Sequence, residues 1–117
     1  MSPSLLDDIN CDGFIDLQQI SAGGYHTCGL TPSEELVCFG NNTYGESTPP
    51  TNGSYTYISS GYEHSCAIHS SGSLECFGNN NEEQSTPPIG NFVHVSAGFK
   101  HSCAVDATGD IQCWGEN

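Results

Sequence analysis

Six of the seven cysteines in this 117-residue sequence fall into three pairs with the same spacing. Each pair is separated by nine residues that include a turn signal: Cys28/Cys38, Cys66/Cys76 and Cys103/Cys113. Two antiparallel strands joined by such a turn place facing Cα atoms about 4.5–5.5 Å apart, within reach of a disulfide. Zinc sites favour C-x-x-C pairs, which the sequence lacks, and buried free thiols are the remaining alternative. We therefore predict three disulfides.

A histidine stands two residues before the first cysteine of every pair. These residues, His26, His64 and His101, could form a ring of metal ligands or bases around a channel. They could instead be structural braces, each hydrogen-bonded to a neighbouring loop in its blade, and their regular recurrence favours this structural role. His69 and His94 do not recur, and we expect them to be exposed.

An acidic stretch near the start has the spacing of a calcium loop. Asp8, Asn10, Asp12 and Asp16 place oxygen ligands in the pattern D-x-N-x-D-G-x-x-D, which resembles the loop of dockerin and EF-hand proteins. Gln19 stands where a bidentate acid belongs, and no helical pattern follows. The stretch is either a weak calcium site or an acidic turn.

Three further features complete the candidate chemistry. Cys11 has no counterpart in the repeats, so it is either free or bridged to another chain. Asn41 and Asn52 begin N-glycosylation triplets in predicted loops. The paired carboxylates at 34–35 and 82–83 lie in predicted turns, and no phosphate-binding glycine loop occurs. We expect no enzymatic activity.

Composition restricts the partners of the chain. It has one Lys or Arg against 14 Asp and Glu, a formal net charge of −13, which excludes a phosphate-tracking nucleic-acid binder and a polybasic membrane protein. No apolar run approaches the roughly 18 residues of a membrane span. The start also lacks signal-peptide character, so we expect Met1 to begin a mature or trimmed chain. Seven cysteines in a short chain predict an oxidising, extracellular or cell-surface location.

The elements that position these residues are internal repeats. The segments 20–28, 58–66 and 95–103 share one pattern at offsets of 38 and 37 residues. The pattern divides the chain into an N-terminal segment, 1–19, and repeats at 20–57, 58–94 and 95–117, the last incomplete. Segments 65–68 and 74–77 are expected strands around the turn Ser71-Gly72, and the diprolines at 49–50 and 87–88 predict loops or edges. The pattern indicates an all-β chain with blade-sized units of three to four strands.

These repeats resemble those of the regulator of chromosome condensation family. The resemblance rests on Ile/Val-Ser-x-Gly-x-x-His-Ser/Thr-Cys followed by Cys-Phe/Trp-Gly-x-Asn, and it covers about residues 20–117. It implies a β-propeller, although three repeats are too few to close the usual ring. The sequence departs from its own pattern at Glu83, which stands where the first repeat has Gly45, and it stops before a third diproline.

Two functions follow as expectations. The first is a structural or adhesive extracellular protein that assembles with itself head to tail, as a fibre or a two-chain ring. Residues 1–19 would donate a missing outer strand, and Cys11 could lock it. The alternative is a protein-binding propeller module, such as a secreted inhibitor or receptor-like binder. It would use Tyr25, Tyr62 and Phe99, which follow repeat glycines, unless these rings serve blade packing. The family's nucleotide-exchange activity fits this short, acidic chain badly.

Overall fold

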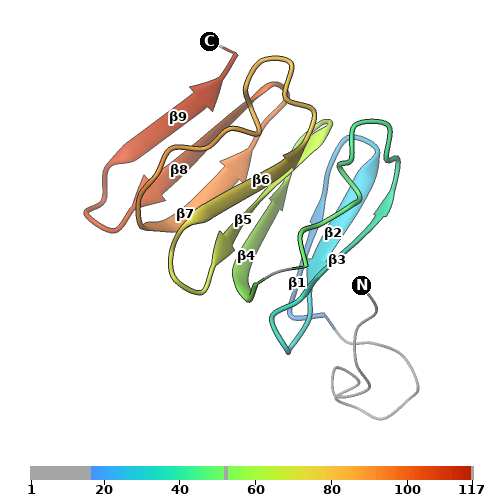
Figure 1. Ribbon diagram of the computed structural model, residues 1–117, viewed down its shortest axis with the longest axis horizontal. Coiled ribbons are helices and arrows are strands. Elements are labelled where there is room, and N and C mark those ends of the chain that lie inside the picture. Colours follow the sequence, from blue (N-terminus) through green and yellow to red (C-terminus); the bar gives the residue numbers. More distant parts are fainter. Residues whose placement is uncertain (1–16, 52, 117) are drawn as a thin grey trace.

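The computed structural model describes residues 17–51 and 53–116. These residues form nine strands and no helix, arranged as three antiparallel three-stranded sheets (Figure 1). Blade 1 holds β1 (Gln19–Ala22), β2 (His26–Leu30) and β3 (Leu36–Gly40). Blade 2 holds β4 (Tyr55–Ser60), β5 (His64–His69) and β6 (Leu74–Gly78). Blade 3 holds β7 (Phe92–Ala97), β8 (His101–Asp106) and β9 (Ile111–Gly115), and the predicted all-β class is confirmed.

A disulfide crosses the second hairpin of every blade. The two strands pair so that the cysteines face each other directly: Cys28 with Cys38, Cys66 with Cys76 and Cys103 with Cys113. Their Cα atoms are 4.0–4.1 Å apart, and each pair is bridged. The turn between β5 and β6 uses Gly72 at φ +96°, a conformation that glycine adopts without a side-chain clash.

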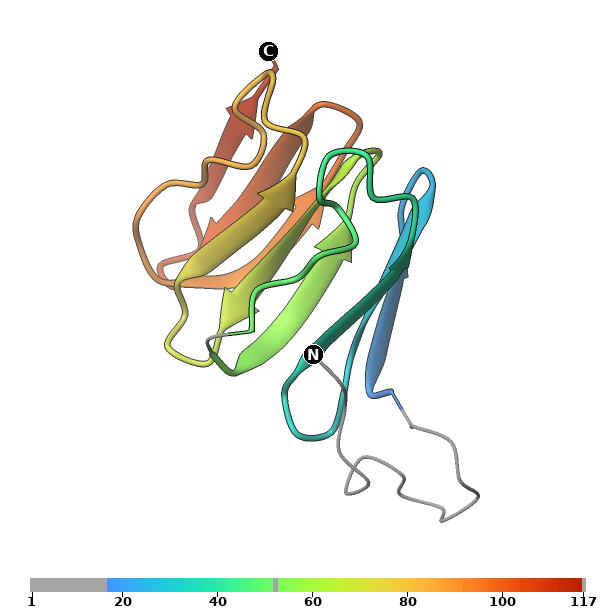
Figure 2. The ribbon, with the colours of Figure 1, turned by 45° about the vertical axis from the view of Figure 1, so that its right-hand side comes forward.

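The blades follow one another in chain order, with blade 1 and blade 3 at opposite ends (Figures 1 and 2). The first strands of the blades are neighbours, because β4 lies beside both β1 and β7. Antiparallel pairing occurs only within a blade, so side chains and loops hold one blade to the next. The three sheets form part of a propeller and do not close a ring.

The hydrophobic core consists of two clusters, one between each pair of neighbouring blades. In the first cluster one face of blade 1 meets the facing side of blade 2, and its buried members are Cys28, Leu30, Leu36, Tyr55, Ile58 and Ala67. In the second, blade 2 meets blade 3 through Cys66, Ile68, Phe92, Val95 and Ala104. A blade is too thin to bury its own apolar residues, so the stacking of blades creates the core.

The loops that leave β3 and β6 also connect neighbouring blades. Glu46 and Gln84 occupy equivalent loop positions and are 1% and 2% exposed. The side-chain Oε1 atoms accept hydrogen bonds from the backbone N–H groups of Tyr44 and Glu82, both at 2.8 Å. The backbone oxygen of Gln84 accepts a hydrogen bond from Trp114 Nε1 at 2.9 Å. The loop of blade 2 therefore covers part of blade 3.

The sequence located the second hairpin of blade 2 correctly. Both expected strands lie within β5 and β6, and the diprolines at 49–50 and 87–88 lie outside the strands. No helix long and apolar enough to cross a membrane occurs in the part of the chain that the structure describes.

Candidate functional site

Three aromatic rings form a continuous row across the three blades. They are carried by the loops that join the first and second strands of each blade. The ring centroids of Tyr25 and Tyr62 are 5.4 Å apart, and those of Tyr62 and Phe99 are 4.4 Å apart. Tyr62 also donates its hydroxyl to that of Tyr25 at 3.3 Å. Tyr25 is 62% exposed and Phe99 is 56% exposed. We call these three residues the aromatic ridge.

Glycines allow the loops under the ridge to pack closely. A Cβ atom on Gly23 would lie 2.3 Å from the carbonyl oxygen of Gly61, and one on Gly61 would lie 2.5 Å from that of Gly98. Backbone hydrogen bonds join the same loops, from the Gly24 N–H to the Gly61 oxygen and from the Tyr62 N–H to the Gly98 oxygen. The ridge therefore stands on a fixed backbone that has little room to rearrange.

The one basic side chain of the sequence lies at the end of the ridge. The Lys100 Nζ atom is 5.5 Å from the centroid of the Phe99 ring, which is a cation–π distance. A row of apolar rings next to a single positive charge suits a partner that presents apolar side chains beside a carboxylate.

The three ridge residues do not all stand at the same distance from the repeat histidine. Tyr62 and Phe99 both stand two residues before the repeat histidine, whereas Tyr25 stands one residue before it. The Tyr25 counterparts are Glu63 and Lys100. All three residues nevertheless follow a repeat glycine in equivalent loops, as predicted, and the Tyr25 ring reaches Tyr62. The rings contact one another between blades, as the blade-packing alternative predicts, and two of them remain mostly exposed.

Two repeat histidines lie between blades. His26 is 3% exposed, and its Nε2 atom is hydrogen-bonded to Ser65 Oγ at 2.6 Å. His64 is fully buried and makes the same bond to Ser102 Oγ at 2.7 Å. These contacts match the bracing role, with the partner on a strand of the next blade. His101, in contrast, is exposed.

Burial makes both buried histidines hard to protonate. It lowers the pKa of His64 to about 4, with a smaller lowering from the charges of His26 and His101. Burial also lowers the pKa of His26, although the Glu46 carboxylate acts in the opposite direction. Both side chains are therefore neutral near pH 7, as a buried hydrogen-bonding brace requires.

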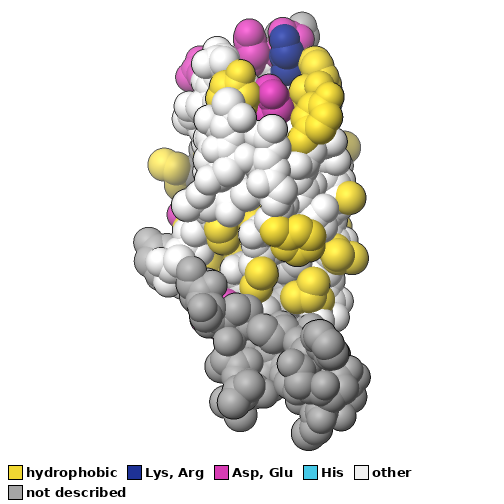
Figure 3. Space-filling view, turned by 90° about the vertical axis from the view of Figure 1, so that its right-hand side faces the viewer, with side chains coloured by type: hydrophobic (Ala, Val, Ile, Leu, Met, Phe, Trp, Pro, Cys, Tyr) yellow, Lys and Arg dark blue, Asp and Glu magenta, His cyan; other side chains and the backbone are white. Residues whose placement is uncertain are grey.

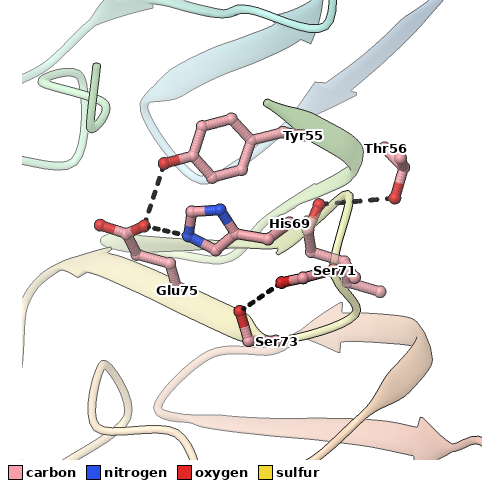
Figure 4. Close-up of polar contacts among 7 residues, drawn as sticks. Tyr55, Thr56, His69, Ser71, Ser73 and Glu75 are labelled. Carbon is pink, nitrogen blue, oxygen red and sulfur yellow. Dashed lines mark hydrogen bonds and ion pairs between the residues drawn. The ribbon is translucent and has the colours of Figure 1, made fainter. Parts of the chain in front are cut away.

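The structure corrects the expectation for His69. This side chain is 23% exposed, and its Nε2 atom is 2.6 Å from Glu75 Oε1 (Figure 4). Tyr55 donates its hydroxyl to the same oxygen at 2.9 Å, and its ring lies 4.5 Å from the His69 ring. Desolvation, with help from Glu75, raises the pKa of Tyr55. Sequence reasoning missed this cluster because blades 1 and 3 have Val37 and Gln112 in place of Glu75.

The remaining predicted residues divide into described and undescribed positions. His94 is exposed as expected, and its ring lies 5.5 Å from that of Tyr57. Asn41 is exposed, in a turn where its Oδ1 accepts the Thr43 N–H at 2.9 Å. The proposed calcium ligands Asp8, Asn10, Asp12 and Asp16, together with Cys11 and Asn52, lie outside the described residues. Within residues 17–51 and 53–116, no group of three or more His, Cys, Asp or Glu side chains is placed to hold a metal ion.

Comparison with known families identifies the repeat. The sequence model of the regulator of chromosome condensation (RCC1) repeat matches residues 18–46, 55–84 and 92–117. The chain belongs to the RCC1 repeat family. Each matched segment contains the three strands of one blade, so an RCC1 repeat and a blade coincide here. No curated protein matches the chain.

Solved structures with a similar fold include two receptor ectodomains. The ectodomain of the Physcomitrella patens receptor kinase CR4 is 30% identical with a TM-score of 0.74, over 85% of this chain and 29% of that one. The CRINKLY WD40 ectodomain of the Arabidopsis thaliana receptor kinase ACR4 is 24% identical with a TM-score of 0.73, over 85% and 38%. A structure of Kap60 bound to yeast RCC1 (Prp20) matches at 22% identity and a TM-score of 0.75, over 88% and 33%. The chain thus spans 29–38% of the length of these relatives.

Proposed function

We propose that this RCC1-repeat chain is an extracellular binding module that holds a protein partner on its aromatic ridge. The contiguous rings of Tyr25, Tyr62 and Phe99, of which Tyr25 and Phe99 are mostly exposed, carry this proposal. Aromatic side chains dominate the energy of many protein interfaces, and they cost little entropy when the loops beneath them are already fixed. The glycine-packed loops meet that condition.

Two observations support an extracellular location. Each blade carries a disulfide, and such bridges persist mainly in oxidising compartments. The similar structures include the ectodomains of two plant receptor kinases. An acidic surface with one basic residue also argues against contact with nucleic acid.

Site-specific photo-crosslinking tests the ridge. A benzophenone amino acid replaces Tyr62 in one sample and Tyr44, an exposed tyrosine that is not part of the ridge, in the control. Both proteins are exposed to the secreted and cell-surface proteins of the source organism. We expect a discrete adduct from position 62 that disappears when Tyr25→Ser and Phe99→Ser are added. Equal adducts from both positions, or none from position 62, would contradict the proposal.

Head-to-tail self-assembly is the second candidate function. The two outer faces of the array expose residues whose counterparts are buried between blades. Ile20 is 63% exposed in blade 1, whereas the equivalent Ile58 and Val95 are 3% and 4% exposed. Two copies would supply six blades, within the usual range of about four to eight, and a contact that does not close would give a fibre.

Calcium binding by the acidic loop stays a prediction from the sequence. Three carboxylates and one amide favour Ca²⁺, and the Gln19 side chain in place of an acid predicts weak affinity. Titration calorimetry with millimolar Ca²⁺ should give a binding signal that the Asp12→Ala variant loses. If wild type and variant give the same heats, the stretch is an acidic turn.

A further inference from the structure

The two internal blade interfaces use the same three polar contacts. Between blades 1 and 2, the Ser60 N–H donates to Ser21 Oγ at 2.9 Å and the Gly24 N–H donates to the Gly61 oxygen at 3.0 Å. The third contact joins His26 and Ser65. The equivalent residues connect blades 2 and 3: Ala97 to Ser59 at 3.0 Å, Tyr62 to Gly98 at 3.1 Å, and His64 with Ser102. Both interfaces therefore use the same set of hydrogen bonds between equivalent residues.

The apolar contacts repeat in the same way. Each interface places the disulfide and two aliphatic residues of one blade against an aliphatic and an aromatic residue of the next. Blade 1 contributes Leu30 and Leu36, and blade 2 faces them with Ile58 and Phe77. At the second interface blade 2 contributes Ile68 and Leu74, and blade 3 contributes Val95 and Trp114.

The outer face of blade 3 carries the first half of this interface. The counterpart of His26 and His64 is the exposed His101, which lines a hollow with the Cys103–Cys113 disulfide. Ile111 is 71% exposed, although its blade 1 counterpart Leu36 is 1% exposed. Ser96 stands at the position of Ser21 and Ser59 and is exposed.

The outer face of blade 1 carries the second half. Ile20 and Phe39 are 63% and 54% exposed, while their counterparts in blades 2 and 3 pack into the interfaces. Thr27 stands at the position of Ser65 and Ser102, which are hydrogen-bonded to the histidines, and both of those serines are fully buried. Figure 3 looks onto this end of the molecule, where hydrophobic side chains are gathered.

We propose that the outer face of blade 3 docks onto blade 1 of a second copy of this chain in the register of the internal interfaces. His101 of one copy bonds to Thr27 of the other, the Phe99 N–H donates to the Gly23 oxygen, and the Ala22 N–H donates to Ser96. Ile111 and the Cys103–Cys113 disulfide cover Ile20 and Phe39. The inference rests on the second candidate function and adds the residues and the register.

The partner that covers these outer faces follows from the complementarity between the face of blade 3 and the face of blade 1. An exposed apolar face alone does not identify what covers it, but here both halves of a known interface are present on one chain. A further RCC1 blade from another chain could use the same face, and the experiment below separates that case because it uses this chain alone. A contact between unlike faces leaves one of each free, so the association is heterologous.

Two face-blocking variants test the docking. Ile20→Asp places a charge on the blade 1 face, and Ile111→Asp places one on the blade 3 face. Both side chains are mostly exposed in the single chain, so each variant should fold. Ile89→Asp is the matched control, because Ile89 is fully exposed and belongs to neither face. Sedimentation velocity is the measurement.

We expect wild type and Ile89→Asp to associate, and each blocked variant to associate at least about tenfold more weakly, since a buried charge must be desolvated. An equimolar mixture of the two blocked variants retains one intact face of each kind, so it should give a one-to-one heterodimer and nothing larger. A monomeric wild type would overturn both this inference and the second candidate function. Association that survives both substitutions would overturn the docking faces and leave self-assembly standing.

Cysteine trapping tests the register in a Cys11→Ser background. The rings of Tyr57 and His94 hold equivalent positions in blades 2 and 3 and lie 5.5 Å apart, so the predicted intermolecular neighbours are His94 and Gln19. A His94→Cys chain mixed with a Gln19→Cys chain should form a mixed disulfide on mild oxidation. Gln18→Cys, one residue out of register, should form much less. Equal trapping at 18 and 19 would contradict the proposed register.

Discussion

At the level of single residues, position in the array decides what the repeated histidine does. His64 belongs to blade 2, which has a neighbouring blade on each side. Its side chain is fully buried and is hydrogen-bonded to Ser102 of blade 3. His101 has the same sequence context but lies on an outer face and is exposed. The difference comes from the neighbouring blade and not from the local sequence.

The buried His64 should make stability depend on pH. Its pKa is about 4 in the folded chain and 6.5 for an unperturbed histidine. Between these two values the unfolded chain binds more protons than the folded chain. The free energy of unfolding therefore has its full value above pH 6.5 and falls as the pH drops toward 4. The loss is on the order of 2–3 kcal/mol over that window. Thermal melts from pH 7.5 to pH 4 measure it.

A glutamine at position 64 provides the control for this prediction. His64→Gln keeps an amide that can bond to Ser102 but removes the titrating ring, so its melting temperature should change less between pH 7 and pH 5 than that of wild type. His101→Gln alters an exposed ring and should keep the wild-type slope. If all three proteins lose stability in parallel, carboxylates and not His64 govern the response.

The bracing histidines could be predicted because the sequence shows them three times. The cluster of Tyr55, His69 and Glu75 could not, because it occurs in one blade and joins residues up to 20 positions apart. The contact between Tyr25 and Tyr62 was equally hidden, since it depends on how two loops of different blades approach. Repetition revealed the residues that are used in every blade and gave no signal for those used once.

At the level of elements, the loops after β3 and β6 share a left-handed turn with different residues. Gly45 has φ +88°, and Glu83 at the matching position has φ +60°. Non-glycine residues pay a steric cost in this region, while a Cβ on Gly45 would have no neighbour within 4 Å. Glu83 therefore adds local backbone strain to the loop after β6, which keeps the same left-handed turn as the loop after β3.

Exchanging these residues should change stability in opposite directions. Glu83→Gly relieves the left-handed strain and should raise the free energy of unfolding by about 0.5–1 kcal/mol. Gly45→Ala introduces the strain and should lower it by about 1 kcal/mol. Urea unfolding measures both. Glu83→Ala separates conformation from charge: it removes the carboxylate without supplying a glycine, so a gain as large as that of Glu83→Gly would show that charge was responsible.

The hairpins could be predicted from the sequence because a turn signal and two facing cysteines specify each one locally. Blade stacking could not, because its other hydrogen bonds join backbone and hydroxyl groups 36–39 positions apart that carry no distinctive pattern. The family resemblance supplied the propeller, and the structure supplied the contacts between blades.

The three hairpin bridges predict a defined change in mass. Reduction should add two hydrogens per disulfide, six in all, to the intact protein. The paired variant Cys66→Ala with Cys76→Ala should add only four and should lose about 2–4 kcal/mol of stability, because the closed loop and the buried Cys66 packing are both removed. Mass spectrometry before and after reduction decides this. Six reactive thiols in the oxidised, denatured protein would contradict the three bridges.

At the level of the whole molecule, charge opposes the contact that the outer faces favour. The chain has a net charge of −13 and a single basic residue, so two copies repel each other over distances comparable to the Debye length. The proposed interface is apolar apart from neutral hydrogen bonds, which leaves little attraction for salt to weaken. Added salt should therefore strengthen self-association.

Sedimentation at several salt concentrations tests this balance. Raising the ionic strength from about 0.01 M to 0.15 M shortens the Debye length from about 30 Å to 8 Å, which screens most of the repulsion between approaching copies. We expect the apparent dissociation constant of the wild type to fall over this range, while Ile111→Asp associates weakly throughout because its blocked face stays blocked. The one-to-one mixture of Ile20→Asp and Ile111→Asp should follow the wild-type trend, since its remaining interface is unchanged. Association that weakens with salt would mean that Lys100 and carboxylates of the second copy hold the assembly, and the apolar faces would then not be its basis.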